Sequence, residues 1–243
     1  MDLRSEYLRV KEETEELLGL NLISNKGSTE KDNDNNNCTV EIPNKNLIRS
    51  LSDHMQKIYD YDERLFNHSL AVSLIAAFIG RNLELTLDEI DELYIAGALH
   101  DIGKIYIPKK VIDKKGKLDI DERKIIEAHP AYSIWYLTTG NMEEKPQYYS
   151  RKILDMIRYH HEEVSGYGYP YGLKRNQINE GAKIIAIADK LEAYGAKRSY
   201  HEARTLKQCI EFIERQVAEG VLDSKITTAT VSLLKNILEK GDM

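Results

Sequence analysis

Residues 99–105 read Leu-His-Asp-Ile-Gly-Lys-Ile, and this stretch decides the expected fold because it places two polar residues at the end of an apolar helix. That helix is predicted over Thr86–Leu99, and His100 and Asp101 follow it directly. A buried imidazole or carboxylate is costly unless it has a partner. The pair therefore predicts a polar site inside a helical core. A His-Asp dipeptide alone is a weak signal, so the surrounding sequence has to supply the rest.

The sequence on both sides of this stretch predicts one helix after another. One apolar stripe at spacings of three and four residues, the period of a helix face, is formed by Leu65, His68, Val72, Ile75 and Ile79. Thr86, with Glu89 three residues later, fits the N-cap of the helix that ends at residue 99. Further helices are predicted over Asp121–Leu137 (which Pro130 interrupts), Tyr149–Glu162, Gln177–Lys197, Leu206–Glu219 and Ser224–Lys240. The chain is therefore expected to be all-α.

The first 40 residues are expected to lie apart from this helical domain. Residues 2–20 carry a heptad-like apolar stripe, and residues 24–37 are polar and are typical of a linker. The stripe is too short to require a coiled coil, so the first helix either docks on its own domain or contributes to a homodimer. We divide the chain into residues 1–40, an N-terminal helix with a polar linker, and residues 41–243, the helical domain.

Composition and charge exclude several functional classes. The net charge is −6, so a nucleic acid polymer is not an expected partner. The longest apolar run, residues 70–79, is too short to span a membrane, and the N-terminus has no signal-peptide pattern. Cys38 and Cys209 offer at most one disulfide, which favours a reduced, cytoplasmic compartment.

Five of the seven histidines lie at the ends or on the inward faces of predicted helices, where a core normally carries apolar residues: His68, His100, His129, His160 and His161. A single such histidine is usually a core residue with its own partner, but five weaken that explanation. Shared metal ions satisfy several imidazoles at once, and imidazole with carboxylate suits zinc, iron, manganese or nickel. Asp101 can bridge two metals through its two oxygens, and Asp189 follows another apolar run.

In their order along the chain, these motifs resemble the HD-GYP family of the HD superfamily of metal-dependent phosphohydrolases. The similarity runs from about Asn67 to Tyr200, and it includes residues 67–69, 99–105, 116–118, 129–130, 160–162, 166–170 and 198–200. It implies an HD-type helical bundle with a metal centre in its core. It also implies hydrolysis of cyclic di-GMP, or of a related cyclic dinucleotide, to a linear dinucleotide or GMP. The divalent metals of the family are iron or manganese more often than zinc.

The resemblance further implies roles for individual residues. By position, one metal would be held by His68, His100, Asp101 and Asp189, and the other by His129, His160 and His161, with Asp101 shared. Lys104 would contact the scissile phosphate, and Arg198 would bind the substrate. Some members with three metals carry a glutamate four residues before the first histidine. Arg64 stands there in this chain, so we expect two metal ions.

Two metal ions account for this chemistry without a serine or cysteine nucleophile. Cations about 3.5–4 Å apart turn a shared water into a metal-bridged hydroxide and clamp the phosphate oxygens. We assign catalytic roles to Asp101 and to Lys104, whose charge would stabilise the phosphate or the leaving oxygen. Tyr169 would stack on a substrate purine, although packing within the protein explains it equally well. Glu162 either orients a ligand histidine or is exposed.

Further departures from the family pattern, besides Arg64, leave alternatives open. Ser165 stands where an aspartate is common, and Tyr106 follows the 99–105 motif at a position that is often small. A large side chain there could crowd the site. The domain could therefore be an HD phosphohydrolase of another nucleotide. It could also be a weakly active or inactive nucleotide-binding module that retains the metal site.

Overall fold

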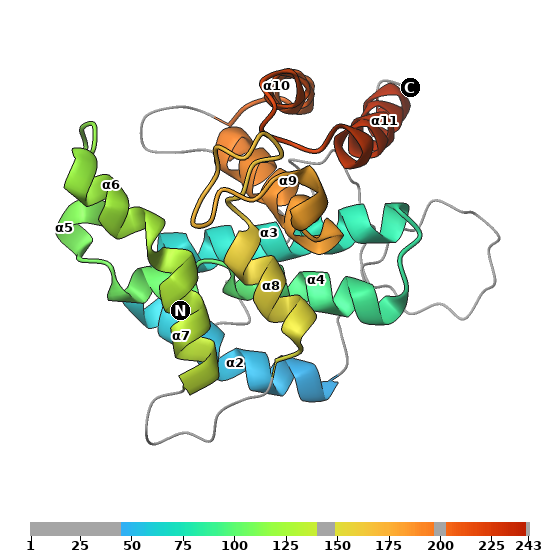
Figure 1. Ribbon diagram of the computed structural model, residues 1–243. Coiled ribbons are helices and arrows are strands. Elements are labelled where there is room, and N and C mark those ends of the chain that lie inside the picture. Colours follow the sequence, from blue (N-terminus) through green and yellow to red (C-terminus); the bar gives the residue numbers. More distant parts are fainter. Residues whose placement is uncertain (1–44, 140–148, 197–202, 242–243) are drawn as a thin grey trace.

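The computed structural model describes residues 45–139, 149–196 and 203–241, and every regular element within these ranges is helical (Figure 1). The all-α prediction is therefore confirmed for this part of the chain. Residues 1–40, predicted to form an N-terminal helix and a linker, lie outside the described residues, and so do both alternatives for that helix, docking on its own domain or contact in a homodimer. Across the described ranges, every helix is too short or too polar to cross a bilayer.

Helix α3 (Glu63–Asn82) is the centre of the fold. Its residues 69–80 are all buried, because α2 (Lys45–Tyr61), α4 (Leu87–Leu99) and α9 (Glu180–Gly195) pack around it. Figure 1 shows α3 and α4 side by side in the middle of the molecule. Residues on these buried helices are therefore well placed to build a site that is shielded from water.

The close packing of α3 on α4 brings two predicted site residues together. A Cβ atom on Gly97 would lie 2.7 Å from Cα of Ser73, so only glycine allows the two backbones to approach this closely. As a result, the rings of His68 on α3 and His100 at the end of α4 have centroids 5.2 Å apart. The predicted N-cap of α4 is also confirmed, since Thr86 and Glu89 form a reciprocal capping pair.

The remaining elements surround this centre. They are η1 (Ile102–Tyr106), α5 (Lys109–Ile112), α6 (Ile120–Glu127), α7 (His129–Thr139), α8 (Arg151–Tyr159), η2 (Arg175–Gln177), α10 (Leu206–Ala218) and α11 (Ser224–Gly241). Helix α8 packs on α4 and α9, α7 packs on η1 and α8, and α10 and α11 pack on α9. By contrast, α5 and α6 project from the body, and α6 has no buried residue (Figure 1).

The prediction of one helix over Asp121–Leu137 is wrong. The chain forms two helices, α6 and α7, that meet at Ala128, the C-cap of α6. Pro130 lies in the first turn of α7, where its missing N–H has no helical partner to lose, so it begins a new helix rather than bending an old one. The break matters for the site because it places His129 at a helix start.

Candidate metal centre

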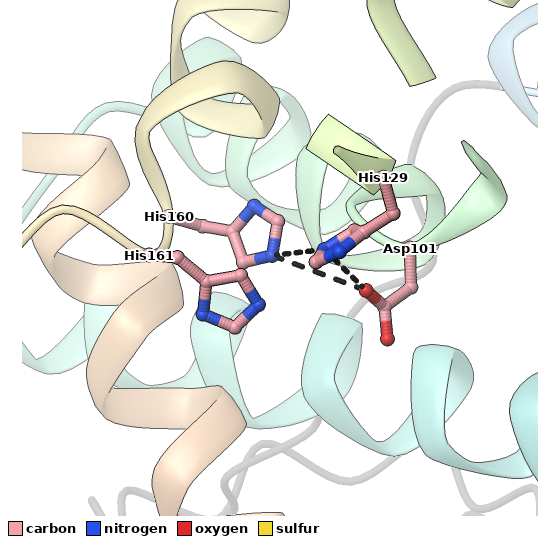
Figure 2. Close-up of side chains that lie close together, drawn as sticks. All are labelled: Asp101, His129, His160 and His161. Atoms are coloured by element: carbon pink, nitrogen blue, oxygen red, sulfur yellow. Dashed lines mark hydrogen bonds and ion pairs between the residues drawn. The ribbon is translucent and has the colours of Figure 1, made fainter. Parts of the chain in front are cut away.

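The seven side chains predicted as metal ligands converge where five helices, α3, α4, α7, α8 and α9, meet: His68, His100, Asp101, His129, His160, His161 and Asp189. Figure 2 shows four of them, drawn from the ends of α4, α7 and α8. His100 and His160 are the C-caps of α4 and α8, and His129 begins α7. Most of the predicted ligand side chains therefore come from the ends of helices.

Three histidines share one backbone contact that fixes their rings. In each, Nδ1 lies 2.7 Å from the carbonyl oxygen three residues earlier: His100 on Gly97, His129 on Ile126, and His160 on Ile157. A carbonyl oxygen only accepts, so Nδ1 carries a proton, and in the neutral ring the lone pair is then on Nε2. These carbonyls end α4, α6 and α8, where the last backbone oxygens lack helical partners. The helix ends thus turn three Nε2 atoms inward.

Asp101 is buried at the centre and faces different histidines with its two oxygens. Oδ1 lies 3.0 Å from Nε2 of His129 and 3.9 Å from Nε2 of His160. Oδ2 lies 3.5 Å from Nε2 of His68 and 3.4 Å from Nε2 of His100. One carboxylate therefore belongs to two groups of ligand atoms, which is the arrangement that a bridging ligand requires.

Lone pairs face one another in this centre, and a cation would satisfy them. Nε2 of His129 lies 3.3 Å from Nε2 of His160, and neither carries a proton when Nδ1 donates to a carbonyl. Nε2 of His100 and Oδ1 of Asp101 are buried without a hydrogen-bond partner among the described residues. Unpartnered buried polar atoms are costly. Four such atoms in one place, all from imidazole or carboxylate, fit a divalent metal site.

Burial keeps most of these groups in the protonation state that binds metals. Burial lowers the pKa of His129, and it lowers the pKa of His160 and of His161 well below the usual value, aided by the neighbouring rings. These three imidazoles are therefore neutral near pH 7. Burial alone would raise the pKa of Asp101, but His100 and Lys104 hold it well below its usual range, so this carboxylate stays ionised.

A close approach between η1 and α7 sets Asp101 opposite His129. A Cβ atom on Gly103 would lie 2.1 Å from the carbonyl oxygen of His129 and 2.5 Å from the amide nitrogen of Ser133. The hydroxyl of Ser133 accepts the N–H of Gly103 at 2.8 Å and donates to the carbonyl oxygen of His100 at 3.1 Å. The glycine of the 99–105 motif is thus required by backbone packing.

The loop of residues 166–172 folds against the histidine pair. Gly168 packs so closely that a Cβ atom would lie 2.5 Å from the carbonyl oxygen of His161. Tyr169 then lies over His161, with ring centroids 4.7 Å apart and the planes at 33°. Tyr169 therefore packs on a predicted ligand, whereas Tyr167 is 91% exposed. Burial raises the pKa of Tyr169, so its hydroxyl remains a hydrogen-bond donor.

Glu162 and Ser165 hold this loop in place. Glu162 is buried, and its two oxygens accept the N–H groups of Tyr171 and Leu173 at 2.7 Å each. The alternative in which Glu162 is exposed is therefore wrong. Ser165 accepts the N–H of Tyr167 at 3.4 Å, a turn contact that an aspartate side chain also makes. Serine at this position therefore makes the same kind of turn hydrogen bond as the aspartate of the family pattern.

The other predicted site residues have different placements. Lys104 pairs with Oδ2 of Asp101, and its side chain is 25% exposed, so it lies at the edge of the centre. Arg198, predicted to bind substrate, lies outside the described residues. Tyr106 packs edge-on against Trp135, with ring centroids 5.2 Å apart, and Trp135 lies beyond the first turn of α7 that carries His129. The ring of Tyr106 therefore extends along α7.

Glu192 is a residue of this centre that the motifs do not reveal. It is 6% exposed, and its Oε2 lies 2.5 Å from Nδ1 of His68. Asp189 contacts the other nitrogen, Nε2, at 3.2 Å. Burial alone would lower the pKa of His68, but Glu192, Asp101 and Asp189 hold it well above the usual value. A proton on Nε2 would thus have to leave when a metal binds. The spacing of three residues after Asp189 is the signal that could have found Glu192, because it puts both carboxylates on one helix face.

Comparison with known proteins places these features in a family. The family called HD domain matches residues 46–226. The chain is 32% identical over 172 residues to the cyclic di-GMP phosphodiesterase PA4108 of Pseudomonas aeruginosa, covering 70% of the chain and 39% of that protein. It is 29% identical over 180 residues to 3′3′-cGAMP-specific phosphodiesterase 1 of Vibrio cholerae, covering 74% and 40%. The chain therefore spans about two fifths of the length of these relatives.

Solved structures share the fold. The HD domain of the phosphodiesterase PgpH from L. monocytogenes matches with a TM-score of 0.56 at 19% identity, over 77% of this chain and 97% of that one. Bd1817 from Bdellovibrio bacteriovorus matches with a TM-score of 0.56 at 12% identity, over 78% and 63%. Identities this low carry the fold alone, and they confirm the predicted HD-type helical bundle.

Proposed function

We propose that this chain, which belongs to the HD domain family, is a metal-dependent phosphodiesterase that hydrolyses cyclic di-GMP or a related cyclic dinucleotide. The observation that carries the proposal is the position of Asp101, whose two oxygens face two groups of imidazole nitrogens. A carboxylate shared in this way suits a pair of divalent cations, and such a pair suits the hydrolysis of a phosphodiester. The product would be a linear dinucleotide or GMP.

The proposed cofactor is two divalent metal ions, iron or manganese. One would be held by His68, His100, Asp101 and Asp189, and the other by Asp101, His129, His160 and His161. This donor set holds imidazole and carboxylate without thiolate, which suits these metals. When bound, the two ions would activate water and offset the charge of the attacked phosphate.

The side chains around the ions would position the substrate. Lys104 has three N–H donors, so it can pair with Asp101 and still reach a phosphate oxygen. The protonated hydroxyl of Tyr169 is a second donor beside the centre, and its ring holds His161 in place. Arg198 would supply a second cation for a phosphate, in the bidentate geometry that a guanidinium offers.

Relatives and charge argue for the substrate class. The two relatives described above are named for cyclic di-GMP and 3′3′-cGAMP, and a solved complex of the PgpH HD domain contains cyclic-di-AMP. A cyclic dinucleotide carries two anionic phosphodiesters, so it needs cations in two places on a chain whose net charge is −6. Lys104 and Arg198 are our candidates for these two places.

A turnover assay with a substrate panel tests the proposal. The full chain is loaded with Mn²⁺ or Fe²⁺ without oxygen and is incubated with cyclic di-GMP, 3′3′-cGAMP, cyclic di-AMP and non-cyclic nucleotides. Chromatography should show loss of at least one cyclic dinucleotide, and His129→Ala should abolish that loss. Cleavage of non-cyclic nucleotides alone would reassign the substrate. Binding of a cyclic dinucleotide without cleavage by the metal-loaded protein would instead support a binding module.

A further inference from the structure

His68 differs from the other histidines of the metal centre in how its ring is held. His100, His129 and His160 each donate Nδ1–H to a carbonyl at the end of a helix. His68 lies inside α3, where the nearby carbonyls already accept helical N–H groups. A backbone acceptor of the kind that orients the other three rings is therefore missing for it. Its Nδ1 has to find an acceptor on a side chain.

Helix α9 supplies that acceptor. Oε2 of Glu192 lies 2.5 Å from Nδ1 of His68, and Oδ1 of Asp189, one turn earlier on α9, lies 3.2 Å from Nε2. Each of the two ring nitrogens of His68 therefore contacts one carboxylate of α9. Because a carboxylate only accepts, Glu192 requires the proton on Nδ1, which leaves Nε2 to face Asp101 and Asp189.

We infer that Glu192 is a positioning residue that fixes the ring of His68 and thereby sets the metal affinity of one half of the centre. The inference rests on the metal centre of the proposed function and not on the identity of the substrate. Glu192 contacts the half that contains His68, His100 and Oδ2 of Asp101. The other half, around His129, takes its ring orientation from helix-end carbonyls. Loss of Glu192 should therefore weaken one metal and spare the other.

Negative charge on Glu192 adds to the effect of geometry. A carboxylate that accepts the Nδ1–H of a ligand histidine raises the basicity of Nε2 and locks its tautomer, and removal of such a partner typically costs 10–100-fold in metal affinity. A carbonyl oxygen orients the ring but carries no full charge. The His68 half should consequently depend on a charged acceptor, whereas the His129 half should not.

Titration of the metal-free protein with Mn²⁺ tests the inference, with free Mn²⁺ followed by its magnetic resonance signal. Glu192→Gln keeps the shape of the side chain and removes the charge. It should weaken one of the two Mn²⁺ binding events roughly 10–100-fold and leave the other unchanged. Glu180→Gln is the matched control, because Glu180 is an exposed glutamate at the first turn of the same helix. It should leave both events unchanged.

Two further measurements separate positioning from general stability. In a His68→Ala background, Glu192→Gln should have no additional effect on Mn²⁺ binding, because it acts through the missing ring. In Zn²⁺-loaded protein, the Nδ1 proton of His68 should give a resolved proton resonance that Glu192→Ala removes. Equal weakening of both Mn²⁺ events, or an undiminished effect of Glu192→Gln without His68, would overturn the inference and leave the metal centre standing. Absence of Mn²⁺ binding by the unmodified chain would overturn the centre and the inference together.

Discussion

Oδ1 of Asp101 lies 3.0 Å from Nε2 of His129, while Oδ2 of the same carboxylate faces His68 and His100. Asp101 therefore belongs to both groups of predicted ligands, the one around His68 and the one around His129. His129 belongs only to the second group. Loss of these two residues should have different consequences for metal content, and the difference tests the bridging role directly.

Asp101→Ala should remove both metal ions, and it should lower turnover more than any single His→Ala substitution. His129→Ala should retain the ion on the His68 side. The thermal stability of the metal-loaded protein should fall in both variants, because a ligand that binds only the folded state stabilises it. Elemental analysis of desalted protein, with turnover measured in parallel, checks this. An Asp101→Ala protein that keeps as much metal as His129→Ala would show that Asp101 does not bridge.

Gly103→Ala should destabilise the fold through a clash between backbones. The added Cβ would lie 2.1 Å from the carbonyl oxygen of His129. Both atoms are fixed by the backbone, so no change of side-chain rotamer can relieve the clash. We expect a loss of about 1–3 kcal/mol or more in the free energy of unfolding. Gly116→Ala is the matched control, because a Cβ there meets no atom within 4 Å. Urea unfolding of the metal-free proteins compares them, and equal midpoints would contradict the close approach of η1 to α7.

Helix periodicity and capping predicted most of the described fold, because they are local. The reciprocal pair of Thr86 and Glu89 begins α4 as expected. The failure at Asp121–Leu137 came from reading Pro130 as an interruption of one helix. The first turn of a new helix tolerates proline equally well, and only the packing of α7 on η1 and α8 decides between the two.

The candidate site was predictable where helix ends carry polar residues in an apolar context, as at His100 and His160. It was not predictable where the partner comes from a distant helix. Glu192 lies 124 residues from His68 in sequence, and without the fold it is one of many glutamates on a helix. Glu162 illustrates the same limit, since its partners are the amides of a loop whose path the sequence does not specify.

Glu162→Gln should loosen the loop of residues 166–172 without removing a metal ligand. The amide has one oxygen and can accept one of the two loop N–H groups, so a buried hydrogen bond to a charged acceptor is lost, worth about 1.5–3 kcal/mol. Hydrogen exchange at Tyr171 and Leu173 should become faster, and turnover should fall as Tyr169 shifts from His161. Glu180→Gln is the control, because Glu180 is an exposed glutamate in the first turn of α9 and should leave exchange at both amides unchanged. Unchanged exchange at both amides would show that the loop keeps its conformation without the carboxylate of Glu162.

Deletion of residues 1–37 should leave metal content and turnover per molecule nearly intact. The proposed ligands and Glu192 all lie between residues 68 and 192, and their contacts come from α3, α4, α7, α8 and α9. Circular dichroism and elemental analysis of the shortened chain check this. A shortened chain that folds but holds less metal would show that the N-terminal segment is part of the core.

Lys104→Met should keep both metals and lose rate, because Lys104 is a cation that cannot ligate a metal while protonated. Its ammonium pairs with Oδ2 of Asp101 at the edge of the centre, where a phosphate that reaches the metals would meet it. Methionine has a similar length but no charge. Removal of one donor to a developing oxyanion costs about 10²–10³-fold in rate, and we expect a decrease of this size in turnover of the best cyclic dinucleotide.

The comparison for Lys104→Met is made at matched metal content, with Lys110→Met as the control. Lys110 is an exposed lysine on α5, so the control removes the same charge from the neighbouring surface. Lys110→Met should retain full rate. A Lys104→Met protein that loses metal would show that the lysine supports Asp101 rather than the substrate. One that keeps both its metal and its rate would show that the ammonium contributes nothing to the attacked phosphate, and the catalytic assignment of Lys104 would fall while that of Asp101 stands.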